Sequence, residues 1–321
     1  MTAPAAQEDA VVVSDIAKSF GETRALDGVS FTVRPGELFG FIGPDGAGKT
    51  TLFRILTTLI LPDAGSARVL GLDVDRDLWA IRSSVGYMPG RFSLYPDLTV
   101  EENLRFFAAV FGTTIAEGRA IIEPIWRQLS PFATRRADAL SGGMKQKLAL
   151  CCALVHRPRI LFLDEPTTGV DAVSRREFWE ILAELRATGL TTVVSTPYMD
   201  EAGRCDRVAL IHGGRILGIA PPGALGAGFG HALVAVRGTN RFALLTLLRR
   251  HPDAISVYPF GAELHFTSRH SPTDAPAVAR ELAGWLAANG HAGAEVAPIE
   301  PGVEDTFMAR MGDASPAGEA A

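Results

Sequence analysis

The sequence predicts an α/β protein with a parallel sheet, followed by a smaller α+β domain. Two observations predict the first part. Apolar strands alternate with helical segments, and a glycine-rich turn joins one strand to the helix after it. A composition shift between Gly213 and Gly230, where glycines and Pro221-Pro222 interrupt the chain, predicts a boundary before the second part. Two domains also suit a length of 321 residues.

The elements of the first domain follow from turn residues and hydrophobic period. Residues 1–10 are rich in alanine and polar residues, and we expect a disordered tail there. Residues 97–156 show helical patterns without a comparable strand, which predicts an inserted helical subdomain at about 91–157. Around it we expect strands from Val11 onward and at 38–42, a helix from about Gly48 with Leu52, Ile55, Leu56 and Leu59 on one face, a turn at 62–65, a strand at 160–163, a helix at 177–185 and a strand at 191–194.

The second domain shows the order βαββαβ, which is ferredoxin-like. We expect the first domain to span 11–222 and the second to span 230–312, with a short tail at 313–321. The expected elements are a strand at 232–237, a helix at 241–250, strands at 254–258 and 262–267, a helix at 275–288, a strand at 294–298 and a short helix at 303–311.

Composition and charge exclude several classes of protein. The 31 basic and 36 acidic residues give a net charge of −5, and no long basic block suggests a dedicated nucleic-acid binder. The longest apolar run is Leu148–Val155, whereas a membrane helix needs about 18 residues. Residues 1–10 lack the pattern of a signal peptide. Three cysteines form neither a paired framework nor a metal-ligand spacing, so we expect a reduced, cytoplasmic protein.

A phosphate-binding loop is predicted at Gly43–Thr50, which fits the pattern G-x-x-x-x-G-K-[ST] between a strand and a helix. Glycines let successive N–H groups point at phosphate oxygens, and the helix N-terminus adds partial positive charge. We expect Lys49 to reach the β- and γ-phosphates and the Thr50 hydroxyl to bind Mg²⁺. The residues expected to contact the nucleotide here are Gly43, Pro44, Asp45, Gly46, Ala47, Gly48, Lys49, Thr50 and Thr51.

An acidic pair follows the apolar strand Ile160–Leu163, as the second half of such a site requires. Asp164, at the end of the strand, is expected to hold Mg²⁺ through water. Glu165 is expected to act as the general base for the attacking water. A pair of this kind is a weak signal alone and becomes strong downstream of a phosphate loop.

Three further stretches complete a recognisable pattern: Leu140–Met144 (LSGGM) with the helix after it, the strand ILFLDEP, and TTGVD ending at Asp171. With the phosphate loop, they resemble the ATP-binding subunit of ATP-binding cassette (ABC) transporters over about residues 11–220. The resemblance implies a P-loop NTPase cassette with a parallel core sheet, an antiparallel β edge and an inserted helical subdomain. The ferredoxin-like segment resembles, less specifically, the accessory domain of drug- and antibiotic-exporter ATPases.

The resemblance also implies roles for particular residues. Phe20 would stack on adenine, and Asp171 would communicate across a head-to-tail dimer. The signature segment (Ser141, Gly142, Gly143 and Met144) would contact the γ-phosphate held by the other subunit, with Met144 in place of the usual glutamine. A serine N-cap followed by glycines is chemically suited to this, because it leaves helix-start N–H groups unobstructed.

Two residues depart from the family pattern. Gly90 stands where the hinge glutamine is expected, and Pro197 stands where the switch histidine is expected. Neither side chain can position water or hydrogen-bond a γ-phosphate. A lost contact to the transition state costs about 3–4 kcal/mol by analogy with an oxyanion donor. We therefore expect ATP to bind well and to be hydrolysed slowly in this chain's own site.

The leading interpretation is an ATP-binding and ATP-hydrolysing subunit that energises export, including multidrug export, by a separate membrane permease. We expect ATP and Mg²⁺ as cofactors, a second cassette as partner (a heterodimer with a consensus cassette, or a homodimer), and a peripheral location on the inner face of the cell membrane. Phe92, Leu94 and Tyr95 are candidate docking residues, although they would equally suit a helical-subdomain core. A regulatory cassette with little turnover remains the alternative. A translation- or DNA-associated cassette is disfavoured, since neither a second cassette nor a long coiled-coil insertion is present.

Overall fold

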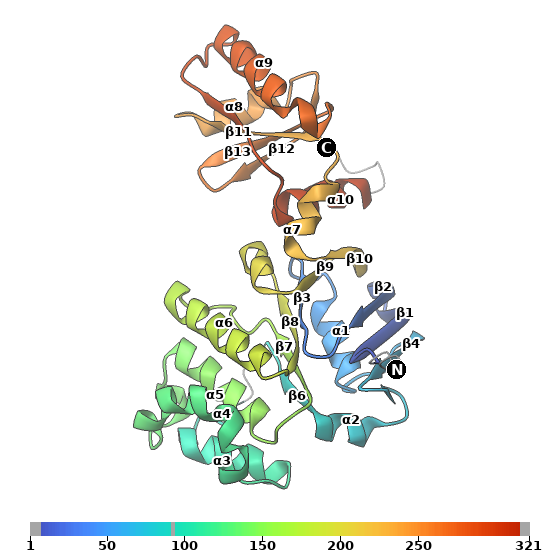
Figure 1. Ribbon diagram of the computed structural model, residues 1–321, viewed down its shortest axis with the longest axis vertical. Coiled ribbons are helices and arrows are strands. Elements are labelled where there is room, and N and C mark those ends of the chain that lie inside the picture. Colours follow the sequence, from blue (N-terminus) through green and yellow to red (C-terminus); the bar gives the residue numbers. More distant parts are fainter. Residues whose placement is uncertain (1–7, 91–93, 315–321) are drawn as a thin grey trace, which may run out of the picture. The chain divides into compact units, whose positions relative to one another are not determined.

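The computed structural model describes residues 8–90 and 94–314. The chain divides into two compact units between Ala220 and Pro221 (Figure 1). We call these units the cassette unit and the C-terminal unit. Within the described residues, no helix is both long enough and apolar enough to span a membrane.

The central sheet of the cassette unit has the strand order β10-β9-β3-β8-β7-β6. Its strands pair in parallel except for β10, which is antiparallel to β9. β3, β7 and β8 are buried along their whole length, as expected for a parallel sheet covered on both faces. The strands are β3 (Leu38–Ile42), β6 (Val85–Met88), β7 (Ile160–Asp164), β8 (Thr191–Thr196), β9 (Arg207–His212) and β10 (Arg215–Ala220).

A second, antiparallel sheet has the order β2-β1-β4-β5. α1 (Lys49–Leu56) packs between the two sheets, against β7 on one side and β2 and β4 on the other. A core of aromatic rings, Phe31, Phe39, Phe41, Phe53 and Phe162, runs through this layer with centroids 4.9–6.0 Å apart. The strands of this sheet are β1 (Val11–Phe20), β2 (Thr23–Val33), β4 (Ala64–Val69) and β5 (Leu72–Asp73), with β2 and β5 at its edges.

Most helices of the cassette unit gather on the other side of the central sheet, whereas the short helix Leu78–Ser84 contacts β5 and β6 (Figure 1). Capping boxes start two of them, with Thr99 paired to Glu102 and Thr114 paired to Glu117. Residues 91–93 of the expected helical subdomain lie outside the described residues. The helices are α2 (Leu78–Ser84), α3 (Val100–Val110), α4 (Ile115–Leu129), α5 (Gly142–Leu154) and α6 (Ala172–Ala187), with short 3₁₀ helices η1 (Ser130–Phe132), η2 (Ala137–Ala139) and η3 (Met199–Arg204).

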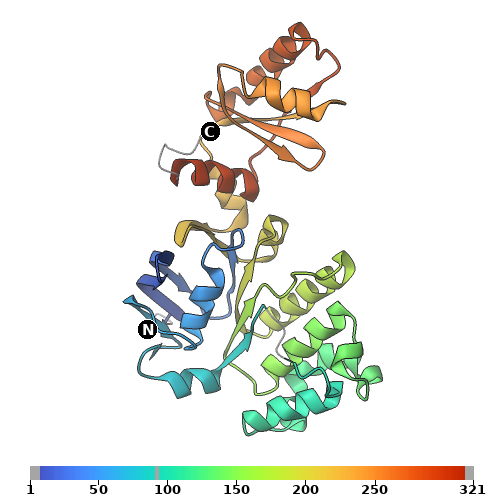
Figure 2. The same cartoon turned by 180° about the vertical axis from the view of Figure 1, so that it is seen from behind.

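The C-terminal unit has the chain order βαββαβ that the sequence predicts (Figure 2). Its antiparallel sheet has the order β12-β13-β11-β14, and α8 and α9 cover one face around Phe266 and Leu282. The elements are α7 (Pro222–Leu225), η4 (Gly226–Gly228), β11 (Ala232–Arg237), α8 (Arg241–Leu248), β12 (Ala254–Phe260), β13 (Glu263–Ser268), η5 (Pro272–Asp274), α9 (Ala275–Ala288), β14 (Glu295–Pro298) and α10 (Val303–Ala314).

On the face that carries His265, α10 is attached to this sheet. Asp305 contacts His265 at 2.6 Å, and this carboxylate raises the pKa of the histidine against the opposing effect of burial. Glu263 lies 3.3 Å from the other ring nitrogen. The last helix is therefore an integral part of the C-terminal unit.

Several local expectations are wrong. Ala10 is buried, and its N–H donates to Val33, so the tail does not extend to residue 10. α1 ends at Leu56, and Leu59 is 53% exposed, because the chain leaves the helix at Thr57 and takes a positive φ at Thr58. β10 occupies part of the glycine-rich stretch assigned to a boundary. Residues 313–314 belong to α10, and residues 1–7 and 315–321 lie outside the described part of the chain.

Candidate functional site

The loop Gly43–Thr50 connects β3 to α1 and is tightly enclosed. A Cβ at Gly43 would lie 2.0 Å from the Ile211 carbonyl oxygen, and one at Gly48 would lie 2.4 Å from that of Ala25. Gly48 also has φ 102°, which favours glycine. Both positions therefore require glycine for the curled backbone that a phosphate cradle needs. Pro44, Asp45 and Gly46 are exposed at the tip, while Ala47 is buried and Thr50 and Thr51 are half-buried.

Lys49 folds back over this loop. Its Nζ donates to the carbonyl oxygens of Gly43 (2.7 Å) and Pro44 (2.9 Å) and lies 3.1 Å from Glu165 Oε1. The residue is 3% exposed. A buried ammonium group needs such partners, because transfer out of water is costly without them. The contact joins the phosphate loop to the acidic pair.

The acidic pair is held by the neighbouring strand. Ser195 Oγ donates to Asp164 Oδ1 (2.7 Å), and the Glu165 N–H donates to the Ser195 backbone oxygen (3.1 Å). Glu165 has φ 51°, an uncommon conformation for a residue with a side chain. Strain of this kind is concentrated at functional sites. Sequence reasoning missed Ser195, which can be found only from the β7–β8 register that aligns it with Asp164.

The oxygen ligands present fit Mg²⁺. Thr50 supplies a hydroxyl in the first turn of α1, and Asp164 supplies a carboxylate at the end of β7. No group of three or more His, Cys, Asp or Glu side chains in residues 8–90 and 94–314 could hold a metal by itself. Since Mg²⁺ commonly uses one or two protein ligands together with substrate phosphates, this donor set suits a nucleotide-bound ion.

The signature segment starts α5. Ser141 is the N-cap and accepts a hydrogen bond from the Met144 N–H (3.3 Å). A Cβ at Gly143 would lie 2.4 Å from Ser174 Oγ, so this glycine allows α5 to approach α6 closely. Gly142 is exposed, and the nearest atom to a Cβ there would be the Gly169 carbonyl oxygen, 3.9 Å away. The N–H groups at the start of the helix are thus left accessible beside Ser141.

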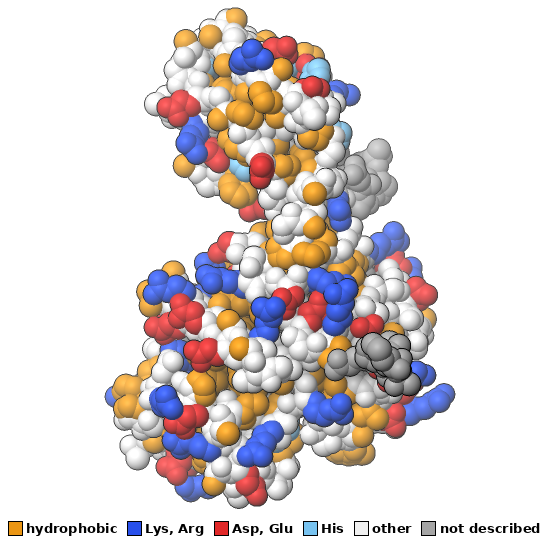
Figure 3. Space-filling view, viewed as in Figure 1, with side chains coloured by type: hydrophobic (Ala, Val, Ile, Leu, Met, Phe, Trp, Pro, Cys, Tyr) orange, Lys and Arg blue, Asp and Glu red, His pale blue; other side chains and the backbone are white. Residues whose placement is uncertain are grey.

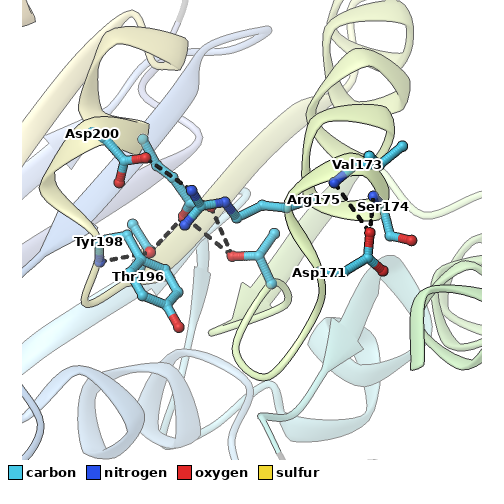
Figure 4. Close-up of polar contacts among 9 residues, drawn as sticks. Asp171, Val173, Ser174, Arg175, Thr196, Tyr198 and Asp200 are labelled. Carbon is cyan, nitrogen blue, oxygen red and sulfur yellow. Dashed lines mark hydrogen bonds and ion pairs between the residues drawn. The ribbon is translucent and has the colours of Figure 1, made fainter.

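Asp171 caps α6 next to this segment (Figure 4). Its Oδ1 accepts from the N–H groups of Val173 (3.1 Å) and Ser174 (3.0 Å). The hydrogen bonds from Ser174 lower the pKa of this carboxyl.

Lys147, in α5, is only 8% exposed. Its Nζ donates to Gln128 of α4 and to Glu177 of α6, so this side chain links α5 to both helices.

The predicted site residues thus form two groups. One is the phosphate loop with Asp164 and Glu165, and the other is the signature segment with Asp171. No hydrogen bond or ion pair joins the two groups directly within the described residues. That the second group acts on the nucleotide of a second subunit, as the resemblance implies, stays a prediction.

Comparison with known proteins decides the family. The model of the family "ABC transporter" matches residues 26–168. The Nod factor export ATP-binding protein I of Rhizobium sp. (strain N33) is 35% identical over 307 residues, which cover 94% of this chain and 97% of that protein. The chain belongs to the ABC transporter ATP-binding family.

Other relatives of this cassette agree. The probable multidrug ABC transporter ATP-binding protein YbhF of Escherichia coli (strain K12) is 44% identical over 225 residues; these are 68% of this chain and only 38% of YbhF. A solved ATP-binding subunit of an ABC transporter has a TM-score of 0.62 at 29% identity, covering 68% of this chain and 92% of that one. A dimeric, post-hydrolysis state of the cassette MJ0796 with ADP and Pi has a TM-score of 0.60 at 26% identity, covering 66% and 98%.

Gly90 and Pro197, at which the resemblance implies a glutamine and a histidine, adjoin the acidic pair and β8. A Cβ at Gly90 would lie 3.0 Å from the Asp164 carbonyl oxygen and 3.8 Å from Glu165 Cβ. Pro197 directly follows β8, whose last residue, Thr196, accepts a hydrogen bond from the Gly43 N–H (3.3 Å). Longer polar side chains at either position would therefore start within the site.

Phe20 lies at the end of β1 and is 51% exposed. Lys18 Nζ lies 5.7 Å from the centre of its ring and is paired with Asp63 at 2.7 Å. The hydrogen bond from Lys18 lowers the pKa of Asp63. An exposed aromatic face at this position is free to stack on a planar base.

An apolar groove of 550 Å³ lies between the sheet and the helices of the cassette. Leu94 lines it but is only 8% exposed, whereas Tyr95 packs against Phe106 with ring centroids 4.7 Å apart. Phe92, the third candidate docking residue, lies outside the described residues. Trp79 belongs to no sequence motif, yet it lines the groove and is 79% exposed. Over the face of the cassette in Figure 3, acidic and basic side chains are intermixed.

Proposed function

We propose that this chain binds and hydrolyses ATP as a subunit of an ABC-type export complex and energises a separate membrane permease. The observation that carries the proposal is the contact of Lys49 with both the phosphate loop and Glu165, which supports phosphate binding and a general base acting together. The names of the relatives, multidrug transport and Nod factor export, support export as the process.

The geometry suggests how the chain's own residues act. Phosphate oxygens would compete with Glu165 for Lys49, and the freed carboxylate would accept a proton from the attacking water. The α1 N-terminus and the N–H groups of the loop would bind the phosphates. Thr50 and Asp164 would hold Mg²⁺, which would neutralise part of the phosphate charge.

Slow hydrolysis in this chain's own site is part of the proposal. Gly90 and Pro197 offer no side chain that hydrogen-bonds water or a γ-phosphate, while the signature segment that would complete a partner's site is regular. A heterodimer with a consensus cassette would therefore hydrolyse ATP faster than a homodimer. Turnover of the purified chain, alone and mixed with a consensus cassette, tests this. Fast turnover by the chain alone, abolished by Glu165→Gln, would contradict a slow site.

The permease is proposed to dock on the apolar groove, where Trp79 offers an exposed ring. This would place the chain at the inner face of the membrane.

A regulatory cassette with little turnover is the second candidate, and the side chains at 90 and 197 favour it. Co-purification from membranes discriminates between the two. Recovery of a permease that is lost in Trp79→Ala supports transport, and recovery of no membrane protein supports regulation.

A further inference from the structure

A buried carboxylate outside the expected set of site residues lies at the centre of a polar network. Arg175, Thr196, Tyr198 and Asp200 belong to this network (Figure 4). Glu201, in η3, is 3% exposed. It accepts hydrogen bonds from Thr196 Oγ1 (2.5 Å) and from Thr167 Oγ1 (2.9 Å). A buried carboxylate is costly unless its oxygens are satisfied. These two hydroxyls are therefore held in place by Glu201.

Both hydroxyls belong to segments of the nucleotide site. Thr167 follows Glu165 by two residues. Thr196 ends β8, and its carbonyl oxygen accepts from the Gly43 N–H at the start of the phosphate loop (3.3 Å). Its Oγ1 also accepts from the Tyr198 N–H (3.0 Å), which closes the backbone around Pro197. Glu201 thus joins the segment of the general base to the phosphate loop through one side chain.

Arg175 covers this carboxylate from α6. Its Nε lies 3.8 Å from Glu201 Oε1, and its Nη2 donates to Asp200 Oδ2 (3.1 Å). Its guanidinium group also lies 5.0 Å from the centre of the Tyr198 ring. Arg175 is one helical turn after Asp171, and its N–H donates to the Asp171 carbonyl oxygen (2.9 Å). The start of α6 is therefore connected to η3 by a single side chain.

We infer that Glu201 and Arg175 are positioning residues for ATP hydrolysis: Glu201 fixes the distance between the phosphate loop and Glu165, and Arg175 holds Glu201 in that position. The inference rests on the proposed function. Glu201 and Arg175 would hold the backbone around Pro197 in place. The proline side chain itself cannot hydrogen-bond phosphate. Small displacements between reacting groups cost rate steeply, about 10²-fold for 1 Å.

Glu201→Gln is the main test, because it keeps the volume and removes one of the two acceptor oxygens. Turnover is measured in a mixture with a consensus cassette whose own phosphate-loop lysine has been replaced, so that only this chain's site hydrolyses ATP. We expect kcat to fall about tenfold and the Kd for ATP to change less than about twofold. Arg175→Met is expected to lower kcat about threefold, and Arg175→Lys to restore most of it. The matched control is Arg176→Met, since Arg176 is an exposed neighbour on the same helix that pairs only weakly with Glu180 (3.7 Å).

Hydrogen exchange of the nucleotide-free chain provides a readout that does not depend on activity. In Glu201→Gln, the amides of Gly43 and Tyr198 are expected to exchange at least about fivefold faster, while Arg176→Met leaves them unchanged. The double variant of Arg175 and Glu201 is expected to be no worse than Glu201→Gln alone, because the two act through one contact. If Glu201→Gln does not fold, Arg175→Met carries the test, since that side chain is 28% exposed.

Unchanged kcat and unchanged exchange in both variants would overturn the inference. So would a fall in kcat that follows the melting temperature alone and appears equally in Arg176→Met. Absence of ATP binding and hydrolysis by the wild-type chain would instead refute the proposed function, and the exchange of the Gly43 and Tyr198 amides would still decide whether Glu201 positions the loop.

Discussion

The phosphate region, comprising Gly43–Thr50 with Asp164 and Glu165, differs in construction from the α5 region, comprising residues 141–156. The phosphate region is built from buried charge and strained backbone, with Lys49 3% exposed and Glu165 at φ 51°. The α5 region is a regular helix with a serine N-cap and a largely apolar body. The first therefore depends on contacts made by other segments, whereas the second is determined mainly by its own sequence.

The largest expected effect is a difference in ATP affinity between variants of two buried lysines, one in each region. Lys49→Ala is expected to weaken ATP binding about a hundredfold, because it removes a charge-assisted contact to phosphate and leaves Glu165 without its cation. Lys147→Ala is the matched control in the α5 region. It is expected to lower the melting temperature, through its lost bonds to Gln128 and Glu177, with no change in ATP affinity. Isothermal titration calorimetry measures both affinities. Equal losses of affinity would show that the two regions are not distinct.

The next largest effect is expected on turnover, when polar side chains are introduced at Gly90 and Pro197. Gly90→Gln with Pro197→His is expected to raise turnover of this chain's own site by about 10²-fold, as the reverse of a lost transition-state donor. The new Cβ at position 90 would lie 3.0 Å from the Asp164 carbonyl oxygen, so a small backbone shift is required. The assay is the mixture with a lysine-replaced consensus cassette, and Gly90→Ala is the control for that shift. If turnover of the double variant does not increase, the missing side chains at positions 90 and 197 do not limit the rate.

In the α5 region, Gly143→Ala is expected to destabilise the cassette by about 1–3 kcal/mol, because its Cβ would lie 2.4 Å from Ser174 Oγ. It should also slow hydrolysis in a partner's site while leaving ATP affinity in this chain's own site unchanged. Gly142→Ala is the matched control for stability, since the nearest atom to its Cβ would be 3.9 Å away. Thermal unfolding compares the two variants, and equal stability would contradict the close packing of α5 on α6.

The smallest expected effect concerns pH at the far end of the α5 region. His156 stacks on Phe111, and burial lowers its pKa below the ordinary value of 6.5. The folded state therefore binds fewer protons than the unfolded state, and stability falls as the pH drops from 6.5 toward the folded-state pKa. Melting temperatures of wild type and His156→Gln between pH 5 and 8 check this. The variant should show the shallower decline on the acid side, and parallel curves would exclude His156 as the cause.

Much of this contrast could be predicted from the sequence, because motifs report local geometry. The phosphate loop, the acidic pair and the Ser141 cap each lie within a few residues of chain. Ser195, Glu201 and Arg175 were not predictable in the same way, since their roles arise from strand register and from contacts between residues more than twenty positions apart. His156 follows the C-terminal end of α5, and its burial disfavours the charged form that a helix dipole would stabilise.

The contact between His265 and Asp305 has a consequence for biosynthesis. The two residues are forty positions apart, and the carboxylate lies on the last helix of the described chain. On the ribosome, β13 emerges well before its partner, so the sheet face that carries His265 has to wait for α10 before it is fully covered. A chain cut before Val303 would retain all four strands but lose Asp305, so His265 would lack the carboxylate that lies 2.6 Å from its ring.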